Sequence, residues 1–142
     1  MQAPLPVPGA SPPTTSAGEV VTAYLTAYLS GDIPTARSMI KDDFSFRAPL
    51  LESTASKDVF FAGAERKASY IRSFSILRQW EDGNEVSTLY RLEVSTSSGS
   101  ASMLMHEWHT TSSGQIASTV MLFDSAAPAA RLLQEALKAP QG

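Results

Sequence analysis

Three short polar turns, each with a glycine, divide the second half of the chain into segments that favour strands. The turns read EDGNE at residues 81–85, TSSGS at 96–100 and TSSGQ at 111–115. Short glycine-containing turns between such segments are typical of antiparallel hairpins. The sequence therefore predicts a meander of long strands, which cover about residues 75–82, 85–96, 101–111 and 115–124.

The start of the chain predicts helices that pack on this meander. Ser16 and Glu19 fit a capping box, and apolar residues then recur at helical spacing as far as Gly31, a common helix stop. Asp32 is placed to cap a second, shorter helix.

The middle and the end of the chain complete the order of elements. A strand is predicted over 43–50, a loop over 50–58 and an amphipathic helix over 63–74, and a final helix begins at Asp124 or Ser125. The core side of the amphipathic helix is predicted to be Ala64, Ala68, Ile71 and Phe74. This order predicts one α+β domain, in which a curved antiparallel sheet packs on helices.

Composition excludes several classes of protein. The chain has 142 residues, no cysteine and a net charge of −3, with acidic and basic residues mixed along it. One domain is expected at this length, and disulfides and thiolate metal sites are excluded. The absence of a basic stripe argues against a nucleic-acid partner, and the apolar runs are too short to cross a membrane.

The first 17 residues differ in composition from the rest. Residues 1–17 are rich in proline, serine and threonine, and they lack the basic and apolar regions of a signal peptide. We expect a flexible tail over 1–17 and a single domain over 18–139. A cytoplasmic location follows from this reading; the alternative is an exported protein whose signal has been removed.

Four segments resemble a known family. VVTAYLTAYLSGD, SMIKDDFSFRAP, FAGAERKASYIRSF and SSGQIASTVMLFD are similar to the SnoaL-like polyketide cyclases and Δ5-3-ketosteroid isomerases, over residues 18–125. These belong to the nuclear-transport-factor-two-like superfamily. The resemblance implies a cone-shaped fold with an apolar internal cavity, and an isomerase, cyclase or dehydratase that acts without a cofactor on an apolar cyclic small molecule.

The resemblance also implies catalytic residues. Tyr24 stands where the isomerases have a helical tyrosine that donates to an oxyanion, and His106 stands at the position of their second donor. Tyr24 and His106 are therefore the predicted catalytic residues. Ala48 occupies the position of the isomerase base, so a ketosteroid isomerase reaction is not expected.

A second comparison is with limonene-type epoxide hydrolases, whose second long strand carries an arginine and an aspartate two residues apart. Arg91 and Glu93 have this spacing and form an alternative catalytic pair, although Met121 replaces the third acidic residue. The more apolar alternate residues of this strand, from Val86 to Val94, are its natural core side. Arg91 and Glu93 would then face outward, unless a β-bulge reverses them.

The run MLMHEWHT over 103–110 contains both histidines of the chain. Side chains alternate along a strand, so His106 and Trp108 share one face, and Glu107 and His109 share the other. The two histidines cannot bind one metal ion, and no metal site is predicted. The resemblance places His106 and Trp108 in the cavity; a shift of one residue would instead place Glu107 there, as a carboxylate base.

The other residues predicted to contact the substrate come from several elements. They are Phe46, Tyr90, Trp108, Thr119, Met121 and Phe123. Aromatic and sulfur-containing side chains with a few polar groups suit an apolar ligand.

The opposite face of the sheet is predicted to form a homodimer. Met103 and Met105, with Ile116, Val120 and Leu122, make that face too apolar for solvent. The alternative function is a non-catalytic ligand-binding or assembly module of the same fold. Ala48 and Met121 favour it, because each stands where a related enzyme has a catalytic group.

Overall fold

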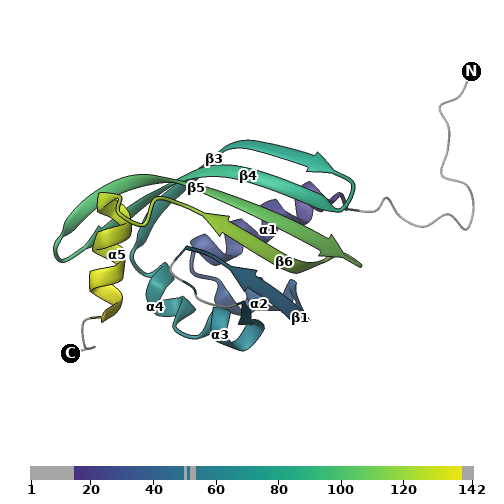
Figure 1. The fold of residues 1–142 in the computed structure, drawn as a ribbon, viewed down its shortest axis with the longest axis horizontal. Coiled ribbons are helices and arrows are strands. Elements are labelled where there is room, and N and C mark those ends of the chain that lie inside the picture. The colour runs from purple at the N-terminus through teal and green to yellow at the C-terminus, as the bar shows by residue number, and fades with distance from the viewer. Residues whose placement is uncertain (1–14, 50, 52–53, 139–142) are drawn as a thin grey trace, which may run out of the picture.

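A strongly curved sheet of six strands forms one layer, and the helices lie against its concave face (Figure 1). The computed structural model describes residues 15–49, 51 and 54–138. Within these residues the predicted α+β fold, with a curved sheet packed on helices, is confirmed. Most of the predicted tail, residues 1–14, lies outside the described residues, as does residue 139 at the predicted end of the domain.

Pairs of helices and strands follow one another in the first half of the chain, and helix α5 ends the described part. The helices described are α1 (Ala17–Leu29), α2 (Ile33–Ser38), α3 (Lys57–Phe61), α4 (Ala64–Ala68) and α5 (Pro128–Lys138). The strands described are β1 (Ile40–Arg47), β2 (Ala55–Ser56), β3 (Ile71–Asp82), β4 (Glu85–Thr96), β5 (Gly99–Ser112) and β6 (Gln115–Leu122).

The strands lie in the order β2-β1-β6-β5-β4-β3. The hairpins predicted from the three glycine-containing turns are present as β3–β4, β4–β5 and β5–β6. One pair departs from the predicted antiparallel sheet, because β1 runs parallel to β6. A strand that arrives from the helical half of the chain can pair with β6 in either direction, since no short hairpin fixes its orientation.

Helix α1 begins at the predicted capping box. The Ser16 hydroxyl accepts from the Glu19 amide at 3.1 Å, and the Glu19 carboxylate accepts from the Ser16 amide at the same distance. Glu81 of β3 accepts from the Gly18 amide at 2.6 Å, which attaches the start of the helix to the sheet. Val21 and Leu25 of α1 are buried and anchor its apolar side in the core.

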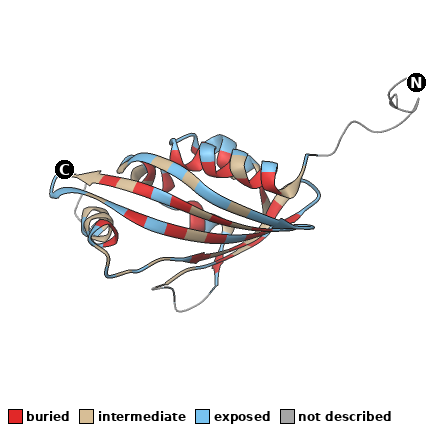
Figure 2. Cartoon of the chain, turned by 90° about the horizontal axis from the view of Figure 1, so that it is seen from above, coloured by how far each residue is buried: buried red, intermediate tan, exposed pale blue. Residues whose placement is uncertain are grey.

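Alternation of side chains defines the two faces of the sheet, and Figure 2 shows buried and exposed positions succeeding each other along the long strands. The concave side of β4 buries Val86, Thr88, Tyr90, Leu92 and Val94. The alternation of apolar residues in the sequence predicts this face.

The helix predicted over 63–74 was wrong in its length. Helix α4 ends at Ala68, while Ile71 and Phe74 belong to β3. Strand β3 pairs with β4 from Ile71 to Asp82, so the hydrogen bonds of a long hairpin outweigh the weak helical periodicity. The predicted loop over 50–58 likewise contains β2 and the start of α3.

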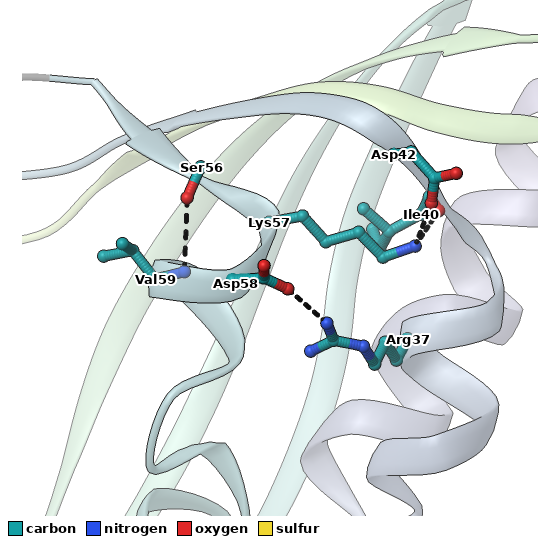
Figure 3. Close-up of polar contacts among 7 residues, drawn as sticks. All are labelled: Arg37, Ile40, Asp42, Ser56, Lys57, Asp58 and Val59. Carbon is teal, nitrogen blue, oxygen red and sulfur yellow. Dashed lines mark hydrogen bonds and ion pairs between the residues drawn. The ribbon is translucent and has the colours of Figure 1, made fainter.

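A polar cluster attaches α3 to α2 and β1 (Figure 3). Arg37 of α2 forms an ion pair with Asp58 of α3. The Lys57 ammonium donates to the Ile40 carbonyl at 2.7 Å and to the Asp42 carboxylate at 3.2 Å. Because the Lys57 side chain is largely buried, its bonds contribute more to holding α3 than the exposed Arg37 pair does.

The cluster positions Phe60, the central ring of an aromatic group beneath the sheet. The centroid of its ring lies 4.5 Å from Phe46, 5.3 Å from Phe44 and 5.6 Å from Tyr28. These contacts join α1, α3 and β1 into one wall of the core.

We expect Phe60→Ala to lower the free energy of unfolding by about 3–5 kcal/mol, because it removes this central ring and leaves a cavity. Val59 is its neighbour on α3 and is 61% exposed, so Val59→Ala should change stability by less than about 0.5 kcal/mol. Urea denaturation of both variants measures the difference. Equal effects would contradict the placement of α3.

Candidate functional site

An apolar cavity of about 190 Å³ lies between the concave face of the sheet, α1 and α5. Leucine, methionine and phenylalanine side chains form most of its wall. Its polar and charged lining residues are Tyr24, Tyr28, Lys67, Tyr90, Glu107 and Gln134. A cavity of about 150 Å³ accommodates benzene, so this one has room for a small ring compound.

Helix α5 covers one side of this cavity. Ala130, Leu133 and Leu137 are among its lining residues. The guanidinium of Arg66, in α4, donates to the carbonyl of Leu137 at 3.0 Å and to that of Ala136 at 2.8 Å. Arg66 therefore holds the C-terminal end of α5 in position, where a cation also interacts favourably with the helix dipole.

The prediction of which side chains of β5 point to the concave side was wrong, because the strand is shifted by one residue from the predicted register. Glu107 and His109 point to the concave side and are 3% and 0% exposed. His106 and Trp108 lie on the outer face, where the His106 ring contacts the Ser87 hydroxyl and Trp108 is 52% exposed. The error arose because MLMHEWHT carries apolar and polar residues on both alternating faces, so the strand alone does not indicate its core side.

Glu107 is held by two neighbouring side chains. The Tyr90 hydroxyl donates to Glu107 Oε2. On the other side, His109 Nε2 lies 3.1 Å from Glu107 Oε1, with the geometry of an ion pair rather than of an aligned hydrogen bond. The ring of Tyr24 stands edge-on to the His109 ring at a centroid distance of 5.8 Å. Strands β4 and β5 and helix α1 thus bring four polar side chains together.

The surroundings of these groups set their protonation. Burial raises the pKa of Glu107, but the contacts with His109 and Tyr90 and the charge of Lys67 outweigh it, so the pKa lies below its ordinary value. Burial, followed by the charge of Glu107, raises the pKa of both Tyr24 and Tyr90. At neutral pH the cavity therefore presents an ionised carboxylate beside two protonated phenols.

The other residues predicted to contact substrate divide into two groups. Tyr24, Tyr90, Met121 and Phe123 line the cavity. Phe46 and Thr119 are buried outside the lining: Phe46 packs on Phe60, and Thr119 lies opposite His109 on the neighbouring strand. No role was predicted for Lys67, and Glu107 was predicted to face the cavity only if the strand were shifted by one residue.

The alternative pair taken from the epoxide hydrolases lies on the outer face. Arg91 is exposed, and Glu93 is 3.4 Å from the guanidinium of Arg72. Strands β4 and β5 pair without a bulge, so nothing turns these two side chains toward the cavity.

The apolar residues of the outer face agree only in part with those predicted. Met103 and Met105 line the cavity and Ile116 is fully buried, so these three were wrong, whereas Val120 and Leu122 lie on the outer face as predicted. The exposed apolar side chains of that face are Trp80, Leu104, Trp108 and Leu122.

In the described part of the chain, no group of three or more histidine, aspartate or glutamate side chains has an arrangement that could bind a metal ion. Among the same residues, no helix has the length and apolar character needed to cross a membrane.

Solved structures share this fold at low sequence identity. An NTF2-like protein of unknown function from Burkholderia pseudomallei is 18% identical, with a TM-score of 0.70 over 84% of this chain and 98% of that one. An LEH-like epoxide hydrolase from M. tuberculosis is 20% identical, with a TM-score of 0.70 over 89% and 95% of the two chains. TerC, co-crystallised with polyporic acid, is 17% identical, with a TM-score of 0.69 over 84% and 99%.

The chain therefore has the fold of the NTF2-like proteins. No protein-family model matches the sequence, and no curated protein is similar to it at a significant level. Identities of this size establish the fold alone, and proteins of one fold catalyse unrelated reactions.

The lowered pKa of Glu107 predicts a specific dependence of stability on pH. Folding favours the ionised carboxylate, so its stabilisation is complete above the ordinary value of 4.5 and is lost as the pH falls through the lower folded-state value. Between about pH 7 and about pH 3, the wild type should lose more unfolding free energy than Glu107→Gln.

Chemical denaturation at several pH values measures this difference. Glu93→Gln removes an exposed carboxylate from the same sheet and should follow the wild type. If the unfolding free energies of the wild type and Glu107→Gln changed with pH in parallel, Glu107 would not be held in its ionised form.

Proposed function

We propose that the protein is a SnoaL-like enzyme that moves a proton on an apolar cyclic small molecule, without a cofactor, and that Glu107 is the base. The observation that carries this proposal is a buried carboxylate, held by Tyr90 and His109, in the wall of a largely apolar cavity. Perturbed carboxylates in clefts are frequent at catalytic sites. The neighbour TerC was crystallised with polyporic acid, which supports a small organic ligand for this fold.

An isomerisation is the simplest reaction that these groups support. Glu107 removes a proton from a carbon next to a substrate carbonyl, so a C–H bond breaks and an O–H bond forms on Glu107. The electron pair moves to the carbonyl oxygen, where the protonated phenol of Tyr24 donates a hydrogen bond to the enolate. In a β,γ-unsaturated carbonyl compound this enolate is conjugated with the C=C bond. Return of the proton from Glu107 to the far carbon of that bond re-forms the carbonyl, moves the double bond into conjugation and gives the isomer.

The predicted roles change accordingly. His106 is replaced by Glu107, because His106 lies on the outer face and cannot reach a ligand in the cavity. Tyr24 keeps its proposed role as donor. Tyr90 and His109 are positioning residues, because each contacts Glu107 and fixes one carboxylate oxygen.

The contacts that hold Glu107 also restrict the substrate. A carboxylate whose pKa is lowered is a weak base, and proton transfer slows as the base becomes weaker relative to the acid. The substrate therefore needs an activated C–H bond, such as one between a carbonyl and a double bond.

A second function is favoured by one observation. Both oxygens of Glu107 already have protein partners, Tyr90 and His109, as expected of a buried charge with a purely structural role. In that case the protein is a non-catalytic module that binds a small molecule. Catalysis by Glu107 distinguishes the two functions.

We also propose that the protein forms a homodimer through the outer face of its sheet. Exposed or half-buried apolar residues of β3, β4, β5 and β6 lie on this face, and Trp80, Ser87, Trp108 and Val120 are paired neighbours in one row across the four strands. The outer patch is defined as Trp80, Leu89, Leu104, Trp108, Val120 and Leu122. Contiguous exposed patches of this kind are typical of interfaces, and a sheet face can pair with the same face of a second copy.

Solvent exchange tests the proposed chemistry. In deuterium oxide, the wild type should accelerate exchange of the protons next to the carbonyl in a panel of small cyclic ketones and enones. Glu107→Gln should reduce this acceleration by a factor of about 100 or more, because the proton acceptor is removed. NMR follows the loss of the proton signals.

Glu93→Gln is the matched control, since its carboxylate lies on the outer face, and it should exchange at the wild-type rate. An undiminished rate in Glu107→Gln would rule out Glu107 as the base. Binding of these compounds without any exchange would favour the non-catalytic module.

Sedimentation tests the dimer. Trp108→Lys places a charge at the centre of the outer patch and should shift the protein from dimer to monomer. Val59→Lys introduces the same charge on α3, at a residue that is 61% exposed, and should leave the dimer intact. A wild type that sediments as a monomer at high concentration would end this proposal.

A further inference from the structure

The cavity has two sets of polar lining groups. The Glu107 carboxylate is compensated by direct contacts with Tyr90 and His109. The other polar lining groups include Lys67 of α4 and Tyr28 of α1, which are close to each other. Tyr28 has no part in the proton transfer described above, and Lys67 affects it only through its charge.

Lys67 lines the cavity without a direct contact to a carboxylate, although its charge acts on Glu107 through space. Its ammonium lies 5.7 Å from the centroid of the Tyr28 ring, and among the described residues it has no ion pair or hydrogen bond. Contact with an aromatic ring offsets only part of the cost of partly burying a charge. A half-buried ammonium in the wall of an apolar cavity is therefore suited to an anion.

Tyr28 provides an independent observation. The residue lines the cavity and is 5% exposed, and its hydroxyl has no hydrogen-bond partner among the described residues. Most buried hydroxyl groups are hydrogen-bonded, and leaving one unsatisfied costs about 1–3 kcal/mol. The neighbouring rings of Phe60 and Phe61 hold the Tyr28 ring in place but offer no acceptor.

We propose that Lys67 and Tyr28 form an anion-binding end of the cavity, and that the natural ligand is an organic acid with a small apolar ring. The carboxylate of the ligand contacts the Lys67 ammonium and accepts from the Tyr28 hydroxyl, while the ring occupies the apolar part of the cavity. This inference rests on the proposed function, because it assigns a substrate class to the same cavity. Glu107 then meets the ring of the ligand rather than its charged group, since two carboxylates would repel each other.

Binding of a matched pair of probes tests this proposal. Cyclohexanecarboxylate and cyclohexanecarboxamide have nearly the same shape, and only the first is charged at neutral pH. Calorimetry with the full chain should show that the carboxylate binds at least about tenfold more tightly than the amide, as expected for hydrogen bonds to a charged group. High salt should reduce this preference.

Three variants identify the residues responsible for the preference for the carboxylate over the amide. Lys67→Met keeps the apolar stem of the side chain. It should weaken binding of the carboxylate probe until its affinity equals that of the amide. Tyr28→Phe keeps the packed ring and should weaken binding of the carboxylate probe several-fold. Lys41→Met removes the same charge from a residue outside the cavity and should retain the preference.

The outcomes separate this inference from the proposed function. Equal binding of the two probes to the wild type, or a preference that survives in Lys67→Met, would overturn the anion site and leave exchange by Glu107 untouched. Failure of both probes to bind would overturn the anion site together with the cavity as a ligand site. Thermal unfolding of Tyr28→Phe and Lys67→Met shows that a lost preference does not come from a lost fold.

Discussion

The pairing of β4 with β5 decides which side chains reach the cavity. Only Ser97 and Ser98 separate the paired ends of these strands, Thr96 and Gly99, and the pairing then continues without a bulge to Glu85 and Thr110. Residues directly opposite each other in a sheet point to the same face. The tight turn therefore places the carboxylate of β5 on the concave side, and a slip of one residue would exchange every group in the site for its neighbour.

Burial of Glu107 connects the stability of the fold to the chemistry of the cavity. An isolated carboxylate in an apolar interior is costly, and removal of one partner from a buried ion pair typically costs about 3–5 kcal/mol. The Glu107 contacts come from β4 and β5, while Tyr24 of α1 packs edge-on against His109. The groups that hold helix and sheet together are thus the same groups that define the polar end of the cavity.

Much of the fold was predictable, because it depends on local signals. The capping box at Ser16 and the glycine-containing turns gave the first helix and the three hairpins. The site was missed because β5 carries mixed residues on both faces, although the core face of β4 and the length of the turn after it together indicated that Glu107 points inward. Lys67 and Tyr28 were not predictable as a pair, since only the tertiary fold brings the Lys67 ammonium of α4 over the Tyr28 ring of α1.

The part of the cavity wall that α5 supplies comes from a terminal helix that packs on β4 and β5 and buries only a small side of itself. In this helix only Ala129 and Ala130 are buried, and Arg66 holds its last turn through two carbonyls. Leu133, Gln134 and Leu137 line the cavity from a terminal element that follows all the strands. Selectivity for ligands can therefore evolve by replacing side chains of a single helix, while the inherited sheet and its buried carboxylate remain unchanged.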